Sequence, residues 1–136
     1  MGYSGGMTYH DVLDDLNPQH RALRTMIPDV YAGFGELSKA AFKSGALDAK
    51  YKELMAVAIG VVHGCDGCIA SHSRAAVKAG ATREEAAEAI GVSILMMGGP
   101  ATIYGARAYD AFCEFAEAEE EAAGASAGVG TATANR

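Results

Sequence analysis

The stretch that decides the fold runs from Lys52 to Gly91 and reads KELMAVAIGVVHGCDGCIASHSRAAVKAGATREEAAEAIG. It is apolar on every side from Leu54 to Val62, which is typical of a helix that other elements cover. His63-Gly64 ends this helix, and a second helix is predicted from about Cys65 to Gly80, since a glycine commonly follows a helix C-terminus. The two segments predict a central helical hairpin.

A third helix begins inside the same stretch. Thr82 is followed three residues later by Glu85, the spacing of a capping box, in which each side chain bonds the other residue's backbone N–H. Ile90, Ile94 and Met97 recur at helical spacing and predict one buried face. The helix is expected to end at Gly98-Gly99-Pro100.

The preceding residues also favour helices. We expect a short helix capped by Thr8 and ending at Leu16, and another running from Pro18 to about Met26. A third opens with Pro28 and ends at Gly45, and Asp48 caps the central helix. In the helix that Pro28 opens, one stripe recurs at helical spacing and is predicted to be buried: Val30, Phe34, Leu37 and Ala41.

A last helix is predicted from about Ala101 to Glu121. Its inward residues are expected to be Tyr104, Ala108, Ala111, Phe112 and Phe115. No segment alternates with period two for long enough to indicate a strand. The fold class is therefore predicted to be all-α.

The two ends differ in composition from this helical region. Residues 1–7 are rich in glycine, and residues 122–136 read AAGASAGVGTATANR, with one charge and little apolar bulk. Such segments bury too little apolar surface to offset the entropy lost on ordering. We predict a flexible N-terminus (1–7), one helical domain (8–121) and a disordered tail (122–136).

Composition excludes several function classes. The chain has 136 residues, with 11 Lys and Arg against 17 Asp and Glu, and a formal net charge of −6. An acidic chain is a poor electrostatic match for nucleic acid or an anionic membrane, and no partner of either kind is expected. The apolar run from Leu54 to Val62 is far short of the ~20 residues that span a bilayer. No apolar, basic leader opens the chain, and we predict a cytoplasmic protein.

Cysteine placement indicates redox chemistry. Cys65 and Cys68 are three residues apart and His72 follows four residues later, so these side chains share one helix face. A helix N-terminus favours a thiolate, and His72 can take a proton from Cys68. Glu53, on the preceding helix, could orient the imidazole. The expected catalytic residues are Cys65, Cys68, His72 and Glu53.

Other interpretations of these residues stay open. Cys65, Cys68, His72 and His63 provide four ligands, the number that structural zinc requires, so a zinc-binding module is the main alternative. His63 could instead interact with the negative end of its own helix. Cys113 lies between Phe112 and Phe115 and is interpreted as a core residue.

The quoted stretch resembles the core motif of the AhpD-like alkylhydroperoxidases of the carboxymuconolactone decarboxylase superfamily. The resemblance extends through MMGGPA and covers roughly residues 28 to 120, with these landmarks: Glu53, Cys65, Cys68, His72, Gly80 and Thr82. It implies an all-helical bundle assembled as a trimer or hexamer, and thiol-dependent reduction of peroxides or disulfides. It also implies a Glu53–His72 proton relay to Cys68, with an external dithiol or reductase as partner and no metal or organic cofactor.

Two departures and one further alternative qualify that resemblance. Several peroxidases of this family carry a second histidine just before the second cysteine, where this chain has Gly67. The decarboxylase branch does not use the cysteine pair, so its presence argues against lactone decarboxylation. A redox adaptor that passes electrons to another peroxidase fits the residues equally well. The surplus of apolar helix faces independently favours a homo-oligomer.

Overall fold

The structure, a computed structural model, describes residues 6–130 and consists almost entirely of helices. Their bounds are α1 (Tyr9–Met26), α2 (Pro28–Phe42), α3 (Ala49–His63), α4 (Asp66–Lys78), α5 (Arg83–Met97) and α6 (Gly99–Gly130). The predicted all-α class is confirmed. No helix in the described residues is both long enough and apolar enough to cross a bilayer.

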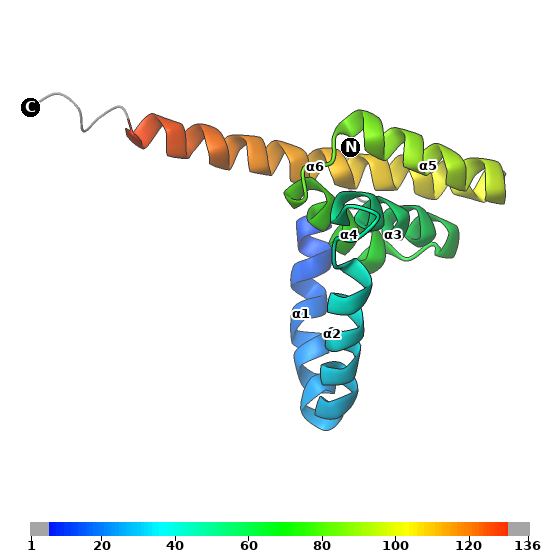
Figure 1. Ribbon diagram of the computed structural model, residues 1–136, viewed down its shortest axis with the longest axis vertical. Helices are drawn as coiled ribbons and strands as arrows, with labels where there is room; N and C mark the ends of the chain where they lie inside the picture. Colours follow the sequence, from blue (N-terminus) through cyan, green and yellow to red (C-terminus); the bar gives the residue numbers. More distant parts are fainter. Residues whose placement is uncertain (1–5, 131–136) are drawn as a thin grey trace, which may run out of the picture.

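The helices form a packed body with a projecting hairpin (Figure 1). Helices α3, α4, α5 and α6 pack against one another, and α5 lies along the first half of α6. Helices α1 and α2 extend away from this body side by side, and the C-terminal half of α6 runs past it. The sequence gives no sign of this projection, because it depends on how the hairpin packs.

The helices of the core lie close together because many of the side chains between them are small. Its larger cluster joins α1 to α3, α4 and α6 through Tyr9, Val57 and Ile69, among others. A smaller cluster gathers Leu54 and Phe112 with three alanines. Among residues 6–130, seven of the sixteen buried hydrophobic residues are alanine. Small side chains let helix axes come close together, so packing here depends on shape complementarity.

The predicted helix boundaries around the central hairpin are confirmed. The Thr8 and Asp48 side chains accept backbone N–H groups at the starts of α1 and α3, and Thr82 forms its capping box with Glu85. Gly64 ends α3 with a φ of 61°. These boundaries depend on local backbone chemistry, and a sequence carries that information directly.

The prediction of two helices between Thr8 and Met26 is wrong. Helix α1 is continuous over 18 residues, with Pro18 in its interior. Proline removes one backbone hydrogen bond and usually breaks or kinks a helix. The carbonyl that loses its partner is that of Asp14, one turn earlier, and Asp14 is exposed, so water can satisfy it.

The stripe predicted to be buried in α2 is exposed. Val30 and Leu37 are each 63% exposed and Phe34 is 70% exposed. The helix instead turns a different face toward α1 and the body, with Tyr31, Gly35, Ser38 and Phe42 partly covered. It also ends at Phe42, before the predicted Gly45. A similar difference affects α5, where Ile90 is buried but Ile94 and Met97 are exposed.

The tail predicted to be disordered is helical as far as the structure describes it. Helix α6 continues without a break through Ala122 to Gly130, and its residues 122–128 are exposed. Alanine has the highest helix propensity, and an existing helix extends at little entropic cost. Residues 1–5 of the predicted flexible N-terminus (1–7) and residues 131–136 of the predicted tail lie outside the described residues.

Candidate active site

The two cysteines lie at the N-terminus of α4 and are joined in a disulfide. Cys65 is the N-cap of the helix, and its Sγ lies 3.2 Å from the backbone nitrogen of Cys68. Both residues are partly exposed. In the reduced state, the unpaired N–H groups of the first helical turn favour negative charge on sulfur. The location therefore suits a redox-active pair.

A tight turn brings α4 back along α3. Gly64 adopts a left-handed conformation, and a Cβ at this position would lie 3.0 Å from the Tyr104 ring of α6. The backbone N–H of Cys65 then bonds the Gly60 carbonyl at 3.0 Å. Both the positive φ and the ring require a glycine here. This turn positions the cysteine pair beside the end of α3.

A carboxylate and an imidazole meet on the same side of this hairpin. Glu53 Oε2 of α3 lies 2.8 Å from His72 Nδ1 of α4, and their side chains are 14% and 29% exposed. With Nδ1–H donating to the carboxylate, Nε2 carries the lone pair and can accept a proton. The structure thus brings together two of the predicted site residues that are nineteen positions apart.

His72 and Cys68 both face α3. A Cβ added at Gly60 of α3 would be 3.4 Å from the Cβ of Cys68, so the two helices are in close contact at the second cysteine. His72 follows one helical turn later and contacts Glu53. The four predicted residues therefore occupy one α3–α4 interface: Glu53, Cys65, Cys68 and His72.

Phe42 is a residue of this site that the sequence did not indicate. The last residue of α2, it stacks on the His72 ring with a centroid distance of 5.3 Å and an interplanar angle of 23°. Phe42 belongs to the less hydrophobic stripe of α2, whereas periodicity predicts burial of the more hydrophobic one. Stacking on one face of the imidazole holds the ring and limits access of water.

Gly67, which stands where the resemblance led us to look for a second histidine, is covered by α1. A Cβ at Gly67 would lie 2.9 Å from Leu16 Cδ1. A larger side chain therefore requires Leu16 to move. The space that a side chain at position 67 would fill is occupied by Leu16 of the projecting hairpin, and this contact between residues 51 positions apart was not visible in the sequence.

The remaining candidates lie elsewhere or form no cluster. His63 is exposed in the last turn of α3, where a cation interacts favourably with the helix dipole. Among residues 6–130, no three His, Cys, Asp or Glu side chains gather in a way that could hold a metal ion. The four-ligand zinc arrangement considered from the sequence therefore has no geometric support in this part of the chain.

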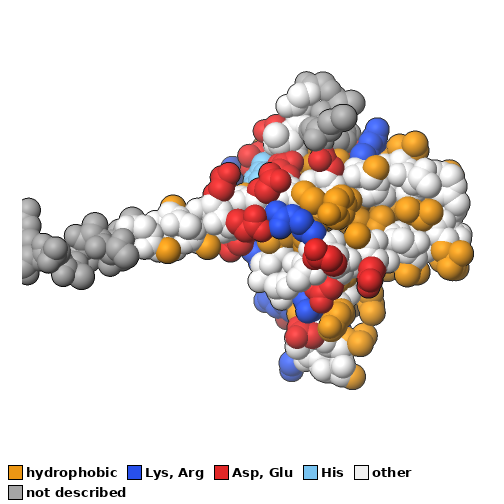
Figure 2. All heavy atoms as spheres, turned by 90° about the horizontal axis from the view of Figure 1, so that it is seen from above, with side chains coloured by type: hydrophobic (Ala, Val, Ile, Leu, Met, Phe, Trp, Pro, Cys, Tyr) orange, Lys and Arg blue, Asp and Glu red, His pale blue; other side chains and the backbone are white. Residues whose placement is uncertain are grey.

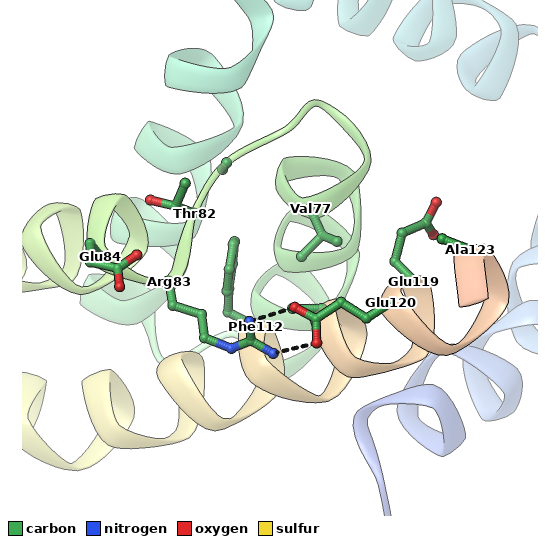
Figure 3. Close-up of a pocket in the computed structure, with 10 residues that line it drawn as sticks. Val77, Thr82, Arg83, Glu84, Phe112, Glu119, Glu120 and Ala123 are labelled. Carbon is green, nitrogen blue, oxygen red and sulfur yellow. Dashed lines mark hydrogen bonds and ion pairs between the residues drawn. The ribbon is translucent and has the colours of Figure 1, made fainter. Parts of the chain in front are cut away.

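Cys113 is not the core residue that its aromatic neighbours suggested. It is partly exposed, and its hydrogen-bonding contact with Tyr109 raises the pKa of that phenol. It also lies beside Arg83, which forms two hydrogen bonds with Glu120. Figure 3 shows this ion pair beside a cavity of about 460 Å³ between α4, α5 and α6. Neither Cys65 nor Cys68 lines that cavity.

Electrostatic contacts attach α1 to the body near the start of α4. The backbone N–H groups of Tyr9 and His10 donate to the Glu114 carboxylate of α6 at 2.9 and 3.0 Å. Burial by itself raises the pKa of Glu114, but these hydrogen bonds and His10 lower it below its ordinary value. Burial, with the nearby charges of Asp110 and Asp66, raises the pKa of Tyr9 to about 12. Tyr9 therefore remains neutral at physiological pH.

The fold and site define an all-helical protein with a disulfide at a helix N-terminus and an adjacent carboxylate–imidazole pair. A sequence profile of the Carboxymuconolactone decarboxylase family matches residues 28–111, more than half of the chain. The chain belongs to this family.

Three proteins are similar to this chain, and one of them is named as a member of the same family. An uncharacterised protein of Cupriavidus necator is 41% identical over 96 residues, which cover 71% of this chain and 85% of the relative. The crystal structure of an apo carboxymuconolactone decarboxylase family protein from Legionella pneumophila superposes with a TM-score of 0.77 at 44% identity, over 79% of this chain and 96% of that one. A Thermotoga maritima protein has a TM-score of 0.67 at 29% identity, over 83% and 96% of the two chains.

Proposed function

We propose that the chain is a thiol-dependent oxidoreductase that reduces hydroperoxides or partner disulfides with the Cys65–Cys68 pair. The observation that carries the proposal is the 2.8 Å contact between Glu53 and His72 on the α4 face that also contains Cys68. A disulfide alone would fit a structural role. A disulfide at a helix N-terminus, with a proton carrier one turn away, provides both a stabilised thiolate and a route for its proton.

The first step oxidises one thiol. The Cys68 thiol transfers its proton to His72, and the thiolate attacks the terminal peroxide oxygen of ROOH. The O–O bond breaks, the sulfur becomes a sulfenic acid, and the alkoxide leaves as ROH after taking the proton from His72. Sulfur loses two electrons and the peroxide gains them. Proton transfer assists both thiolate formation and the leaving group, which favours Cys68 over Cys65 as the attacking residue.

The second and third steps close the cycle. The Cys65 thiol attacks the Cys68 sulfenic acid, forming the disulfide and releasing water. An external dithiol or a reductase then attacks this disulfide and leaves the cysteines reduced and itself oxidised. Such a cycle needs a reducing compartment, which is consistent with the cytoplasm expected from the sequence. In the same cycle, a partner disulfide can replace the peroxide as oxidant.

Glu53 has an indirect role in this scheme. Its carboxylate accepts the Nδ1 proton of His72, and this contact orients the ring and stabilises the imidazolium that forms when Nε2 is protonated. Phe42 restrains the same ring from one face. Gly67 has no side chain that could act as a second proton carrier, which disfavours efficient peroxide reduction. Disulfide reduction or electron transfer to another peroxidase is therefore the alternative physiological role.

The decisive experiment follows each cysteine after oxidation. The reduced protein is treated with substoichiometric cumene hydroperoxide or hydrogen peroxide, and the products are identified by mass spectrometry. We expect a Cys65–Cys68 disulfide in the wild-type chain, a sulfenic acid on Cys68 in Cys65→Ser, and no fast oxidation in Cys68→Ser. Fast oxidation that survives in Cys68→Ser would reverse the assignment of the two cysteines. Slow oxidation of all three proteins would contradict the peroxidase reaction and leave the adaptor role.

A further inference from the structure

Lys52 of α3 is bonded differently from the cationic side chains that pair with carboxylates. Lys50 and Arg83 each form an ion pair with a glutamate, and Figure 2 shows positive and negative side chains side by side near the middle of one face. The Nζ of Lys52 instead donates to two backbone carbonyls, that of Ala41 at 3.0 Å and that of Lys43 at 2.6 Å. Lys52 therefore binds the backbone at the end of α2.

The C-terminus of α2 lacks the glycine cap that ends many helices. The helix ends at Phe42, and the C-cap residue Lys43 has a φ of −58° and a ψ of 130°, which is not the left-handed conformation of such a cap. The last carbonyls of a helix have no partner inside the helix, and they form the negative end of its dipole. Lys52 supplies both a hydrogen-bond donor and a positive charge at this end.

Few apolar contacts hold α2 in place. None of its fifteen residues is buried, and its most hydrophobic side chains are exposed. Helices in proteins are stabilised mainly by packing of an apolar face. The position of the end of α2 therefore depends on local polar contacts more than the position of a buried helix does.

The two carbonyls that Lys52 binds belong to the residues on either side of Phe42. The backbone conformation sets the direction of the Cα–Cβ bond, so hydrogen bonds on both sides of Phe42 restrict where its side chain can point. That side chain stacks on the His72 ring at a centroid distance of 5.3 Å. A continuous series of contacts thus connects the ammonium group of Lys52 to the imidazole.

Lys52 and Glu53 act on the same imidazole from different directions. They are consecutive residues of α3, and their side chains project about 100° apart around the helix axis. Lys52 reaches the end of α2, whereas Glu53 reaches α4 and contacts His72 Nδ1 at 2.8 Å. Glu53 therefore binds the edge of the imidazole, and the ring that Lys52 positions covers one of its faces.

We propose that Lys52 is a positioning residue for His72, because its bonds to the carbonyls of Ala41 and Lys43 hold Phe42 on the imidazole. Proton transfer requires the donor and acceptor atoms to be aligned, so an imidazole that is free to rotate relays a proton less efficiently. The positioning role stands on the contacts alone, while its consequence for the reactivity of Cys68 rests on the proposed function.

Substitutions of two lysines separate these hydrogen bonds from a simple loss of charge. Lys52→Met keeps an unbranched apolar side chain but removes the donors and the charge, whereas Lys52→Arg keeps both. Lys43→Met is the matched control, because Lys43 is an exposed lysine at the same helix end. Circular dichroism and thermal melts check that each variant is folded. Lys52→Gln, with a shorter amide donor, replaces Lys52→Met in every comparison if the latter does not fold.

The first readout is spectroscopic and does not need activity. In the oxidised protein with ¹³C-labelled histidine, the ring proton resonances of His72 should be shifted upfield by the stacked Phe42. The resonances that disappear in His72→Ala identify this residue. The upfield shift should be lost in Phe42→Leu, at least halved in Lys52→Met, and retained in Lys52→Arg and Lys43→Met. An unchanged shift in folded Lys52→Met, or an equal reduction in Lys43→Met, would overturn the positioning role.

The second readout is the reactivity of Cys68 against pH. In a Cys65→Ser background, alkylation of Cys68 by iodoacetamide is followed by mass spectrometry. We expect Lys52→Met to slow alkylation about tenfold near neutral pH, which is less than removal of His72 itself, and the difference should disappear at a pH where the thiolate forms unaided. Lys52→Arg should restore the rate.

The pH dependence distinguishes positioning from general damage. Slowing of the same size at every pH would overturn the link between Lys52 and the relay, because a damaged site is not repaired by forming the thiolate. If His72→Ala left alkylation unchanged, the relay of the proposed function would be contradicted instead. The His72 resonances would then still decide whether Lys52 positions the imidazole.

Discussion

His72 is the residue at which the proposed chemistry can be tested most directly. Replacing it with alanine should slow oxidation of the reduced protein by ~10²–10⁴-fold near neutral pH, because the proton carrier is removed. Raising the pH toward the ordinary thiol pKa of about 8.5 should restore part of the rate, since the thiolate then forms unaided. Stopped-flow measurement of thiol oxidation against pH gives this profile.

Two variants make this prediction specific. Glu53→Gln should act in the same direction but less strongly, because the imidazole stays and only its carboxylate partner is lost. His63→Ala is the matched control, an exposed histidine at the end of α3, and it should leave the profile unchanged. If His63→Ala slowed oxidation as much as His72→Ala, the relay would be wrongly placed.

At the scale of single residues, the sequence indicated the groups with distinctive chemistry but not the apolar groups around them. Cys65, Cys68 and His72 lie within eight residues, so helical spacing alone places them together. Phe42 and Leu16 come from other helices, and their contacts with His72 and Gly67 depend on the placement of α1 and α2. Tertiary packing of that kind leaves no local pattern in the sequence.

At the scale of elements, glycines distinguish crowded helix contacts from open ones. A Cβ at Gly105 of α6 would lie 2.9 Å from Ile90 Cγ2 of α5, and Ile90 is buried. Gly105→Ala should therefore destabilise the protein by about 1–3 kcal/mol through overpacking. Gly91→Ala, in open space on α5, should instead stabilise it by about 0.5–1 kcal/mol. Urea denaturation of the two variants measures the contrast, and equal effects would contradict this account of the α5–α6 contact.

A second element-scale prediction concerns the contact that joins α1 to α6. Glu114 accepts the first two backbone N–H groups of α1, so Glu114→Gln should cost about 1 kcal/mol, the usual effect of losing a helix cap. Because the folded-state pKa of Glu114 is lowered, its stabilisation is present above the ordinary value of 4.5 and disappears as the pH falls through the folded-state pKa. In thermal melts from pH 7 down to 3, the melting temperature of the wild type should approach that of Glu114→Gln as the pH falls. Glu117→Gln, an exposed neighbour, should follow the wild type throughout.

Elements were predictable where side-chain chemistry fixes the backbone. The caps at Thr8, Asp48 and Thr82 and the glycine turn at Gly64 could be read from the sequence because each interaction spans only a few residues. The prediction that Pro18 begins a new helix is wrong because the free-energy cost of a proline inside a helix depends on whether water reaches the carbonyl that loses its partner. A local rule cannot include that information.

At the scale of the whole molecule, the buried side of α2 could not be predicted from one chain. Periodicity identifies an apolar stripe without saying what covers it, and Val30, Phe34 and Leu37 form the most hydrophobic stripe of α2. In the single chain that stripe faces solvent, while less apolar residues face the body. The pattern therefore agrees with burial between copies, and the error lies in assuming that every apolar face is covered within one chain.

The end of α6 provides the last prediction, because helical structure there does not imply a stabilising role. Residues 122–128 are exposed, so their helix is supported by alanine propensity rather than by packing. Of these residues, Ala123 lines the cavity that Arg83 and Glu120 also line. Removing residues 122–136 should shift the melting temperature by less than about 2 °C and leave assembly unchanged, since almost no apolar area is lost. Removing only residues 131–136 is the matched control. A large drop in melting temperature with the longer deletion alone would contradict this account and show that the end of α6 packs against the body, and a change in sedimentation would show that it contributes to assembly.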